Sequence, residues 1–403
     1  MHLNHCWIIL FLFFFSLNTI QSKSETKNEI PSLSEESIIS LLTCAPGDEL
    51  YSVFGHTAIR VNDPDQEIDM VFNYGTFDFN TSFFYLKFAH GSLDYLLSTS
   101  EFKSFMREYF VAGRSVWEQE LDLGEEQKDR LFRALMINAR PENRAYRYDF
   151  FFDNCATRVR DVLLDSFEKE NLSFGKGGVA EELTFRQAIH PYLEAKPWTK
   201  IGIDLVLGIP ADEMTDVRSV MFLPDHLMEQ FSGISIQQGA EKRQLIKGEK
   251  QLLDFPSPVE SGLSAISPML ILWIAALLII MLSLAEIFGY IRMKRVDVVL
   301  FSINGIIGLI IAYLWMISLH EATGPNLNIL WAHPLWFFFV FGNRYRWWGK
   351  VLRYVQLTLL IVLIFTFSLL PQSIPFEFVP VWIILAVRLG KPYIGDILIN
   401  EKK

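Results

Sequence analysis

A histidine and a cysteine that lie far apart in the sequence supply the two side chains that thiol catalysis needs. His56 stands in residues 54–60 (FGHTAIR), and Cys155 stands in residues 153–157 (DNCAT). A thiol attacks a carbonyl carbon as its thiolate, and a neighbouring imidazole can accept the thiol proton and later return it. The pair therefore predicts a base and a nucleophile for acyl transfer through a thioester.

A third residue is expected to orient the imidazole. A histidine base works in one ring orientation and one tautomer, so a polar partner has to fix both. Asn73 in residues 72–77 (FNYGTF) follows His56 on the next expected strand. We therefore predict Asn73 as the orienting residue, with Asp78 and Tyr51 as the alternatives.

The segment that begins at Cys155 is predicted to be a helix. Its apolar residues recur at helical spacing, and Asp153 or Asn154 can cap its first turn. Free N–H groups and the positive end of the helix dipole favour the thiolate. The same N–H groups would stabilise an oxyanion, helped by the side chain of Asn154 or Tyr51. The apolar positions are Val159, Val162, Leu163 and Phe167.

Each of these residues also has a purely structural interpretation. A single histidine on an apolar strand is usually a buried core residue, and Asn154 could serve only as a cap. Cys44 and Cys155 could form a structural disulfide in an exported domain, which would remove the nucleophile. The occurrence of all these groups together favours the catalytic interpretation.

Four strands and a preceding helix are expected to position these residues. The segments alternate apolar and polar side chains and are separated by turns such as residues 45–48 (APGD), which predicts an antiparallel sheet. A leucine stripe predicts a helix over residues 125–139. The expected fold class is α+β. The expected strands are residues 38–43, 51–61, 68–79 and 115–123.

The composition indicates a chain with two different parts. Hydrophobic residues make up 51% and charged residues 20% of the 403 residues, which is too apolar for a soluble enzyme and too charged for a wholly buried membrane protein. The net charge of -10 argues against a nucleic-acid partner, since no basic surface is available for phosphates. We therefore expect an exported domain joined to a membrane domain.

Five apolar segments organise the C-terminal half, and they predict an all-α bundle of about five helices. The first, second and fourth can cross a hydrocarbon layer of about 30 Å, whereas the third and fifth are marginal. Lys and Arg follow the first, third and fifth segments, which predicts an exported N-terminal domain and places residues 320–326 on its side. The segments are residues 268–290, 298–319, 327–341, 351–370 and 374–389. The flanking cations are Arg292, Lys294, Arg295, Arg344, Arg346, Lys350, Arg388, Lys391, Lys402 and Lys403.

These patterns give the domain organisation. The apolar run at residues 7–15 and the small-residue exit predict a signal peptide, although the weak charge before this run leaves an uncleaved anchor as the alternative. The polar stretch before the first span predicts a connector or mobile loop. The expected parts are a signal peptide 1–22, an exported domain 23–236, a connector 237–263, a transmembrane domain 264–391 and a cytoplasmic tail 392–403.

Two other groups of side chains stand outside these motifs. An aromatic cluster after the third strand could line an acyl pocket or belong to an ordinary core. Three histidines lack the spacing of metal ligands, and the expected chemistry requires neither a metal nor a nucleotide cofactor. The aromatic residues are Phe83, Phe84, Tyr85 and Phe88, and the histidines are His90, His190 and His226.

The order of these motifs resembles a known group of enzymes. A His strand, a polar strand and a later Cys that opens a helix resemble circularly permuted papain-like thiol enzymes, the lecithin:retinol acyltransferase-like and NlpC-like group. More closely, residues 41–58 (LLTCAPGDELYSVFGHTA), 72–77 and 153–158 (DNCATR) resemble the Lnb family of Bacteroidota. Residues 198–208 and 326–335 are similar to it too, so the resemblance covers nearly the whole mature chain.

The resemblance implies a lipoprotein N-acyltransferase of the inner membrane with its catalytic domain on the periplasmic face. An acyl chain would pass from a phospholipid to Cys155 and then to the α-amino group of a diacylglyceryl-cysteine. His56 and Cys155 match the family's Gly-His and Asn-Cys motifs, whereas Asn73 is assigned from strand order. Two alternatives stay open: a membrane-tethered cysteine peptidase or amidase that acts on cell-wall peptides, and a non-catalytic envelope protein with a Cys44–Cys155 disulfide.

Overall fold

The computed structural model describes residues 30–167, 172–174, 182–238, 241–256, 266–341 and 347–400. Leu33–Lys403 form one compact unit. The fold class is α+β, as the sequence predicted, because an antiparallel sheet in the N-terminal part is followed by a helical C-terminal part. The expected signal peptide at residues 1–22 lies outside the described residues.

A seven-stranded antiparallel sheet forms the N-terminal domain, in the order β10-β5-β1-β2-β3-β4-β6. The expected strands correspond to β1, β2, β3 and β5, except that residues 51–54 form a turn before β2. Strands β4, β6 and β10 were not predicted. The strands are β1 Ile38–Cys44, β2 His56–Asp63, β3 Ile68–Thr76, β4 Asp94–Glu101, β5 Val116–Leu121, β6 Ala145–Arg147 and β10 Ile246–Leu253.

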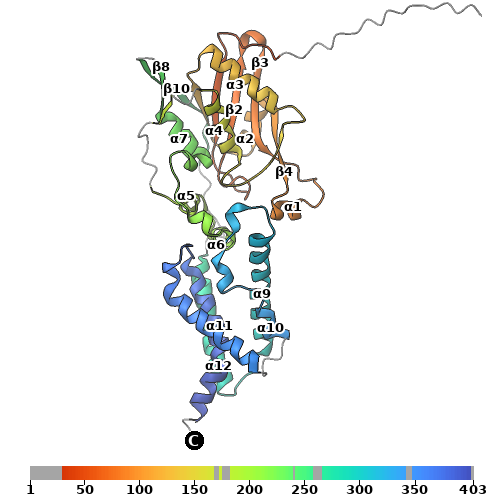
Figure 1. Cartoon of the computed structure of the whole chain (residues 1–403), viewed down its shortest axis with the longest axis vertical. Helices are drawn as coiled ribbons and strands as arrows, with labels where there is room; N and C mark the ends of the chain where they lie inside the picture. The colour runs from red at the N-terminus through yellow and green to blue at the C-terminus, as the bar shows by residue number, and fades with distance from the viewer. Residues whose placement is uncertain are drawn as a thin grey trace, which may run out of the picture. The chain divides into compact units, whose positions relative to one another are not determined.

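Helices cover both faces of this sheet. Successive residues of a strand point to opposite faces. Val71 of β3 packs with Phe105 and Tyr109 of α2 (Phe102–Val111), whereas the ring of Phe72 lies 6.4 Å from that of Phe132 in α3 (Glu125–Asn138). Helix α4 (Cys155–Asp165) packs against α3, β2 and β3 (Figure 1). The strands that carry His56 and Asn73 are therefore held between two helical layers.

A second group of short elements completes this domain around its own apolar core, which includes Phe151, Phe185 and Phe222. Its helices are α5 Phe185–Ile189, α6 Pro197–Val206 and α7 Pro224–Gly233, with the 3-10 helices η3 His190–Leu193, η4 Ile209–Asp212 and η5 Ser219–Phe222. A small antiparallel sheet contains β7 Leu172–Phe174, β8 Ile234–Gln238 and β9 Glu241–Gln244.

The expected connector at residues 237–263 differs from the structure. Its described residues include the end of β8 and all of β9 and β10, and β10 pairs with β5 at the edge of the large sheet. The side chains of the middle of β10 are exposed, so this strand lacks the apolar alternation from which strands are predicted. The prediction of an irregular connector is therefore wrong for the residues that form β10.

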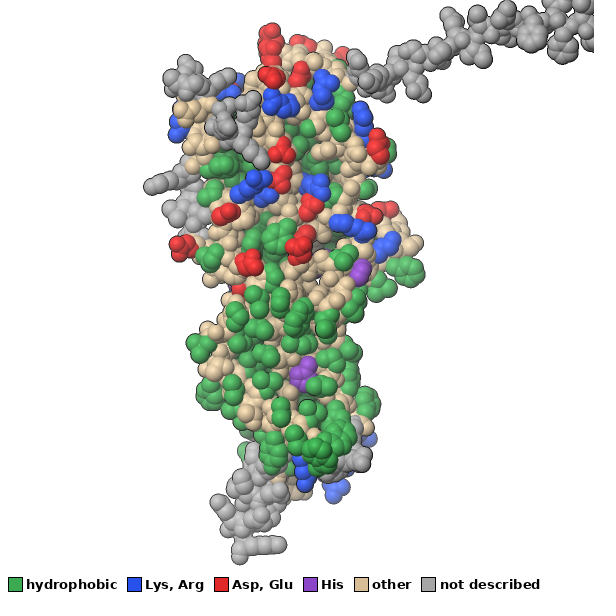
Figure 2. Space-filling view, viewed as in Figure 1, with side chains coloured by type: hydrophobic (Ala, Val, Ile, Leu, Met, Phe, Trp, Pro, Cys, Tyr) green, Lys and Arg blue, Asp and Glu red, His purple; other side chains and the backbone are tan. Residues whose placement is uncertain are grey.

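The described part of the C-terminal region contains five α-helices. Three stretches are long and apolar enough to cross a membrane, namely Pro268–Ile287, Lys294–Met316 and Trp347–Leu369. They correspond to the first, second and fourth expected segments, and hydrophobic side chains gather over the surface of this region (Figure 2). The helices are α8 Pro268–Ile287, α9 Lys294–Met316, α10 Trp336–Phe341, α11 Trp347–Thr366 and α12 Val379–Asn400.

Arg388 of α12 does not lie on the surface as a flanking cation. Its guanidinium is buried, with Nε 2.6 Å from Asp297 of α9 and Nη2 2.8 Å from Glu286 of α8. Nη1 donates to the hydroxyl of Ser283 over 2.8 Å. A charge inside a membrane bundle requires such partners. Arg388 therefore joins three helices through buried contacts.

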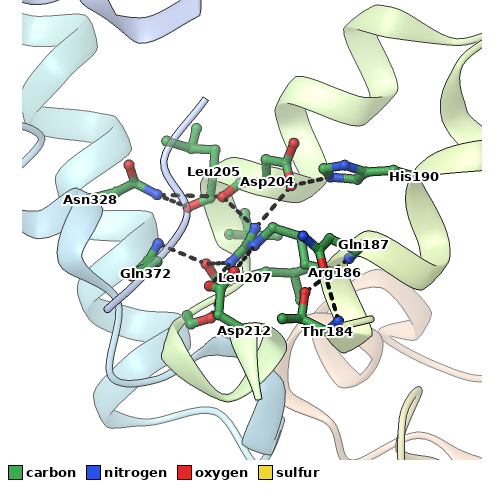
Figure 3. Close-up of polar contacts among 12 residues, drawn as sticks. Thr184, Arg186, Gln187, His190, Asp204, Leu205, Leu207, Asp212, Asn328 and Gln372 are labelled. Carbon is green, nitrogen blue, oxygen red and sulfur yellow. Dashed lines mark hydrogen bonds and ion pairs between the residues drawn. The ribbon is translucent and has the colours of Figure 1, made fainter. Parts of the chain in front are cut away.

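A buried polar cluster lies where the N-terminal domain meets the loops of the helical region. Arg186 of α5 places Nη1 2.9 Å from Asp204 and Nε 3.0 Å from Asp212 (Figure 3). Its Nη2 also donates to the carbonyl oxygens of Leu207 and Gly208 over 3.2 and 3.1 Å. Because the guanidinium donors are all engaged, the buried charge is compensated.

Side chains from the helical region complete this cluster. Asn328 of η8 (Leu327–Leu330) donates to the carbonyl of Leu205 over 3.1 Å, and Gln372 donates to that of Leu207 over 3.1 Å (Figure 3). Both amides are fully buried. Since buried polar groups are costly when unpaired, these contacts fix the carboxyl end of α6 against the membrane region.

The loop after α9 also contacts the N-terminal domain. The N–H of Gly208 donates to Ala322 over 2.9 Å, and the N–H of Ile209 donates to Pro325 over 2.7 Å. Residues 320–326 therefore lie on the same side as the N-terminal domain. This position agrees with the topology predicted from the charged loops.

Candidate active site

Cys155 is the first residue of α4, and Asn154 caps the helix. The Asn154 side-chain oxygen accepts from the N–H groups of Ala156 and Thr157 over 2.8 and 2.9 Å, and the Thr157 hydroxyl accepts from the Asn154 N–H over 2.8 Å. These reciprocal bonds form a capping box, which fixes the start of a helix. The sequence had left Asp153 and Asn154 as alternatives. Asp153 instead pairs with Arg158.

The amide nitrogen of Asn154 is fully used by the fold. It donates to the carbonyl oxygens of Phe150 and Phe222 over 2.7 and 2.8 Å, and a primary amide has two hydrogens to give. No donor remains for an oxyanion. The prediction that the Asn154 side chain helps to stabilise an oxyanion is therefore wrong, and Asn154 positions Cys155 instead.

His56 and Asn73 are in contact on neighbouring strands. The register of β2 and β3 places Ile59 opposite Phe72, so His56 and Asn73 project from the same face along a diagonal. Nε2 of His56 lies 2.5 Å from Oδ1 of Asn73. Since a carbonyl oxygen only accepts, Nε2 carries the hydrogen and Nδ1 is the basic nitrogen. The structure therefore brings together the histidine and its expected orienting residue.

Gly75 brings Cys155 close to the same strand. A Cβ on Gly75 would lie 3.3 Å from Cβ of Cys155 and 3.9 Å from Cε1 of His56, so both side chains border one glycine. Gly75 has a φ of 91°, which side-chain-bearing residues rarely adopt. The backbone N–H of Thr57, which follows His56, acts on the thiol of Cys155 and lowers its pKa. The sulfur thus lies beside the histidine segment.

Burial keeps both reactive groups neutral at pH 7. It raises the pKa of the Cys155 thiol to about 11, although the N–H groups of Thr57, Ala156 and Cys155 act in the opposite direction. Burial also lowers the pKa of His56 to about 4, although the hydrogen bond to Asn73 acts to raise this pKa. The helix start therefore does not produce the expected resting thiolate, because desolvation is the larger effect. A thiol in this state would have to lose its proton before it could act as a nucleophile.

Cys44 and Cys155 are both free thiols in the structure. Cys44 ends β1 opposite His56 and is fully buried. Burial raises the pKa of its thiol to about 12, which leaves it protonated and unreactive. The Cys44–Cys155 disulfide of the non-catalytic alternative is therefore absent from the structure.

Tyr51 and Asp78, the other expected candidates, lie outside this arrangement. The Tyr51 side chain is 65% exposed, and its ring packs edge-on against Phe77 and Phe79. Asp78 accepts hydrogen bonds from Asn80 in an exposed turn. Neither residue is placed to orient His56, so Asn73 is the candidate that the geometry retains.

Arg114 is a cation near the site that the sequence did not reveal. Its Nε donates to the carbonyl of Ala45 over 2.8 Å, and its guanidinium lies 4.8 Å from the centre of the Tyr109 ring. Among the described residues, its buried Nη2 has no hydrogen-bond partner. The positive charge of Arg114 also lowers the pKa of His56. Its effect is smaller than those of burial and of the Asn73 hydrogen bond. A single arginine outside any motif gives no indication in the sequence that it lies near a site. Gly75 does give one, because an isolated glycine in a strand indicates that another part of the chain approaches the backbone closely.

Two family comparisons match this chain. The model of a family described as the Lnb N-terminal periplasmic domain matches residues 27–188, and that of the Lnb transmembrane domain matches residues 259–397. The chain belongs to the Lnb family. Its N-terminal domain, with His56, Asn73 and Cys155, is thus the periplasmic domain of an Lnb-type membrane protein. No match to a curated protein or to a solved structure was found.

Proposed function

We propose that this Lnb-family protein is a lipoprotein N-acyltransferase of the inner membrane. The observations that support the proposal are that the side chains of Cys155 and His56 both border Gly75 and that Nε2 of His56 lies 2.5 Å from Oδ1 of Asn73. Membership of the Lnb family supports a membrane-anchored enzyme that modifies lipoproteins. The donor would be a phospholipid, and the acceptor would be the α-amino group of a diacylglyceryl-cysteine.

The first half-reaction forms a thioester. The Cys155 sulfur attacks an ester carbonyl of the phospholipid while Nδ1 of His56 takes the thiol proton. The tetrahedral intermediate then breaks its bond to the glycerol oxygen, which leaves as a lysophospholipid and takes the proton from His56. A base with a pKa below neutrality is fully deprotonated at the start of this step.

The second half-reaction releases the acyl chain as an amide. The free α-amino group of the lipoprotein cysteine attacks the thioester carbonyl and passes one proton to His56. The carbon–sulfur bond breaks, and His56 returns that proton to the Cys155 thiolate. Asn73 keeps Nε2 protonated in both half-reactions, so the same ring nitrogen serves as base and acid.

Backbone N–H groups are the candidates for stabilising the oxyanion. Asn154 already accepts from the N–H groups of Ala156 and Thr157, so the N–H of Cys155 is the one left in the first helical turn. The N–H of Thr57 reaches the sulfur from the strand side. Two donors that converge near the nucleophile are the usual requirement for an oxyanion hole.

The membrane region suits these substrates. Both substrates keep their reacting groups at the level of the lipid headgroups, and an enzyme tethered there meets them at high effective concentration. Three candidate spans are more than a simple tether needs. This favours lipid substrates over a cell-wall peptide, for which the same Cys155 and His56 would use water as the acceptor.

Mass spectrometry of lipoprotein N-termini tests the proposal. A deletion strain is complemented with the wild-type protein, with Cys155→Ala, or with Cys44→Ala as the control for loss of a buried thiol. We expect N-acylated cysteine with the wild type and Cys44→Ala, and free α-amino groups with Cys155→Ala at equal protein abundance. Full N-acylation in the strain with Cys155→Ala would rule out the thioester route. Free α-amino groups on the lipoproteins of the strain with the wild-type protein would point to the peptidase or amidase.

A further inference from the structure

An aromatic surface surrounds helix α1 (Phe84–His90) of the periplasmic domain. The ring of Phe83 is 75% exposed and that of Tyr85 is 80% exposed, and Leu86 beside them is 67% exposed. The interpretation of these residues as ordinary core is therefore wrong. We call the following set the α1 aromatic surface: Phe77, Phe79, Phe83, Phe84, Tyr85, Leu86 and Phe88.

The backbone holds one of these rings in an uncommon conformation. Phe83 precedes α1 with a φ of 58°, in the left-handed region that aromatic residues seldom adopt. Such a conformation persists only where the surrounding structure enforces it, and it is commonest at functional sites. A protein that exposes several large apolar side chains around one short helix has a contact surface there.

Ring contacts connect this surface to the candidate active site. The rings of Phe88 and Phe84 stack at 6.4 Å, and Phe84 lies 5.8 Å from Phe77. Phe77 lies two residues after Gly75. A Cβ on Gly75 would lie 3.3 Å from Cβ of Cys155. The aromatic contacts therefore run without a break from α1 to Phe77, on the strand end that borders Cys155.

The other end of α1 is bonded to the exit of a candidate span. The N–H of Leu319 donates to the carbonyl of His90 over 2.8 Å, and the Tyr313 hydroxyl lies 3.2 Å from Nδ1 of the same histidine. Nε2 of His320 donates to the carbonyl of Phe88 over 2.7 Å. Since α9 ends at Met316, these bonds hold α1 at the level where the chain leaves the hydrocarbon layer.

The surface has the chemistry of a lipid contact. It continues into the exposed apolar residues Met316, Ile317 and Leu319 that follow the span. Helix α1 has no acidic residue in its first turn, whereas Lys87 and His90 stand in its last turn. A Lys beside aromatic rings is typical of the membrane interface, where it can meet a lipid phosphate.

We propose that the α1 aromatic surface enters the outer leaflet of the membrane and receives the acyl chain of the phospholipid donor. The chain lies along the rings from Phe88 to Phe77, which brings its ester to Cys155 without extraction of the whole lipid into water. This role rests on the proposed acyl transfer. The contact with lipid itself does not require catalysis.

Photolabelling tests the lipid contact separately from catalysis. The full-length Cys155→Ala protein is placed in vesicles of phosphatidylethanolamine and phosphatidylglycerol that contain a phosphatidylethanolamine with a diazirine in its acyl chain. After illumination, we expect labelled peptides that cover residues 77–88 in addition to peptides of the spans. Label that is confined to α8–α12 would overturn the proposal, whether or not the wild-type protein transfers acyl chains.

A pair of donors tests the role of the surface in delivery. Thioester formation on Cys155 is measured with phospholipid vesicles and with a water-soluble short-chain ester. The double variant Phe83→Ser/Leu86→Ser loses apolar contact with the lipid, so we expect its rate of thioester formation with vesicles to fall by about tenfold. Its rate of thioester formation with the short-chain ester should change by less than about twofold. The matched control is Val111→Ser, which removes an apolar side chain on α2 that is 78% exposed. This variant should form the thioester at the wild-type rate with both donors.

The outcomes separate the two proposals. An equal loss with both donors would show that the α1 aromatic surface supports the fold or the chemistry, and it would overturn the delivery role. If the wild-type protein forms no thioester with either donor, the proposed function fails, and the photolabel alone then decides whether α1 contacts lipid.

Discussion

Nε2 of His56 lies 2.5 Å from the side-chain oxygen of Asn73 on the adjacent strand. This contact assigns the hydrogen to Nε2 and leaves Nδ1 as the proton acceptor. Burial lowers the pKa of His56 to about 4, so the ring is a neutral base across the physiological range. We therefore propose that Asn73 is a positioning residue that acts through the tautomer of His56.

Asn73→Ala is expected to lower kcat by about 10- to 100-fold, because the imidazole loses the partner that fixes its tautomer. The KM for the phospholipid should stay unchanged, since Asn73 acts through His56 and does not need to bind the donor. Steady-state kinetics of acyl transfer from the phospholipid to a lipoprotein acceptor, with purified protein, provide the measurement. An unchanged kcat would show that another group orients the ring.

Asn73→Asp provides the matched variant with an altered pH profile. A carboxylate beside the ring favours the protonated imidazole and raises its pKa. If the deprotonated ring is the active base, the wild-type rate should rise through the pKa of His56 at about 4 and should be level at neutral pH. In Asn73→Asp the rise should move to higher pH. A rise at the same pH in both proteins would contradict the role of His56 as the base.

The Cys155 thiol is expected to react slowly with iodoacetamide at neutral pH. Its pKa is raised to about 11 by burial, so the thiolate fraction grows by about tenfold per pH unit up to that value. The alkylation rate should rise without levelling as the pH passes 9.0, the ordinary pKa of a thiol. Cys155→Ala reports the background from the other thiols. A rate that is level above neutral pH would indicate a resting thiolate and contradict the neutral pair.

Much of the sheet and the site could be predicted from local patterns. Strands β1, β2, β3 and β5 alternate or run apolar, and the helix after Cys155 has both a cap and an apolar stripe, so these elements follow from period and capping chemistry. Asn73 was predicted from strand order alone. The contact with His56 depends on the register of β2 and β3, which the hydrophobic pattern specifies well.

Other features depend on contacts that no local pattern contains. Strand β10 is polar and becomes a strand only because β5 offers an unpaired edge. The saturation of Asn154 requires the carbonyl of Phe222, which lies far away in sequence. The neutral state of Cys155 results from burial in the assembled domain, which outweighs the helix dipole that the sequence revealed.

Gly75→Ala is expected to impair thioester formation by at least about tenfold. Its φ of 91° is unfavourable for a residue with a side chain, and a methyl group 3.3 Å from Cβ of Cys155 would force Cys155 to shift by a few tenths of an ångström. The left-handed conformation adds about 1–2 kcal/mol of strain for a residue with a side chain. Gly289→Ala is the control, because that glycine has a φ of 83° and nothing within 4 Å of the added Cβ. Equal activity of the two variants would contradict the close contact.

Arg186→Met tests whether the buried cluster in Figure 3 holds the periplasmic domain on the membrane region. The change leaves Asp204 and Asp212 buried without their cation, and breaking a buried ion pair in this way costs about 3–5 kcal/mol. We expect a clearly lower thermal midpoint for the full-length protein in detergent, measured by the fluorescence of its tryptophans.

Arg130→Met is the matched control for this variant. Arg130 of α3 pairs with Glu126 at the surface, where an ion pair contributes less than about 0.5 kcal/mol. Its thermal midpoint should stay close to that of the wild type. Adding Asp204→Asn to Arg186→Met should recover part of the loss, because it removes one of the two uncompensated charges. Equal midpoints for Arg186→Met and Arg130→Met would show that the cluster contributes nothing to the junction.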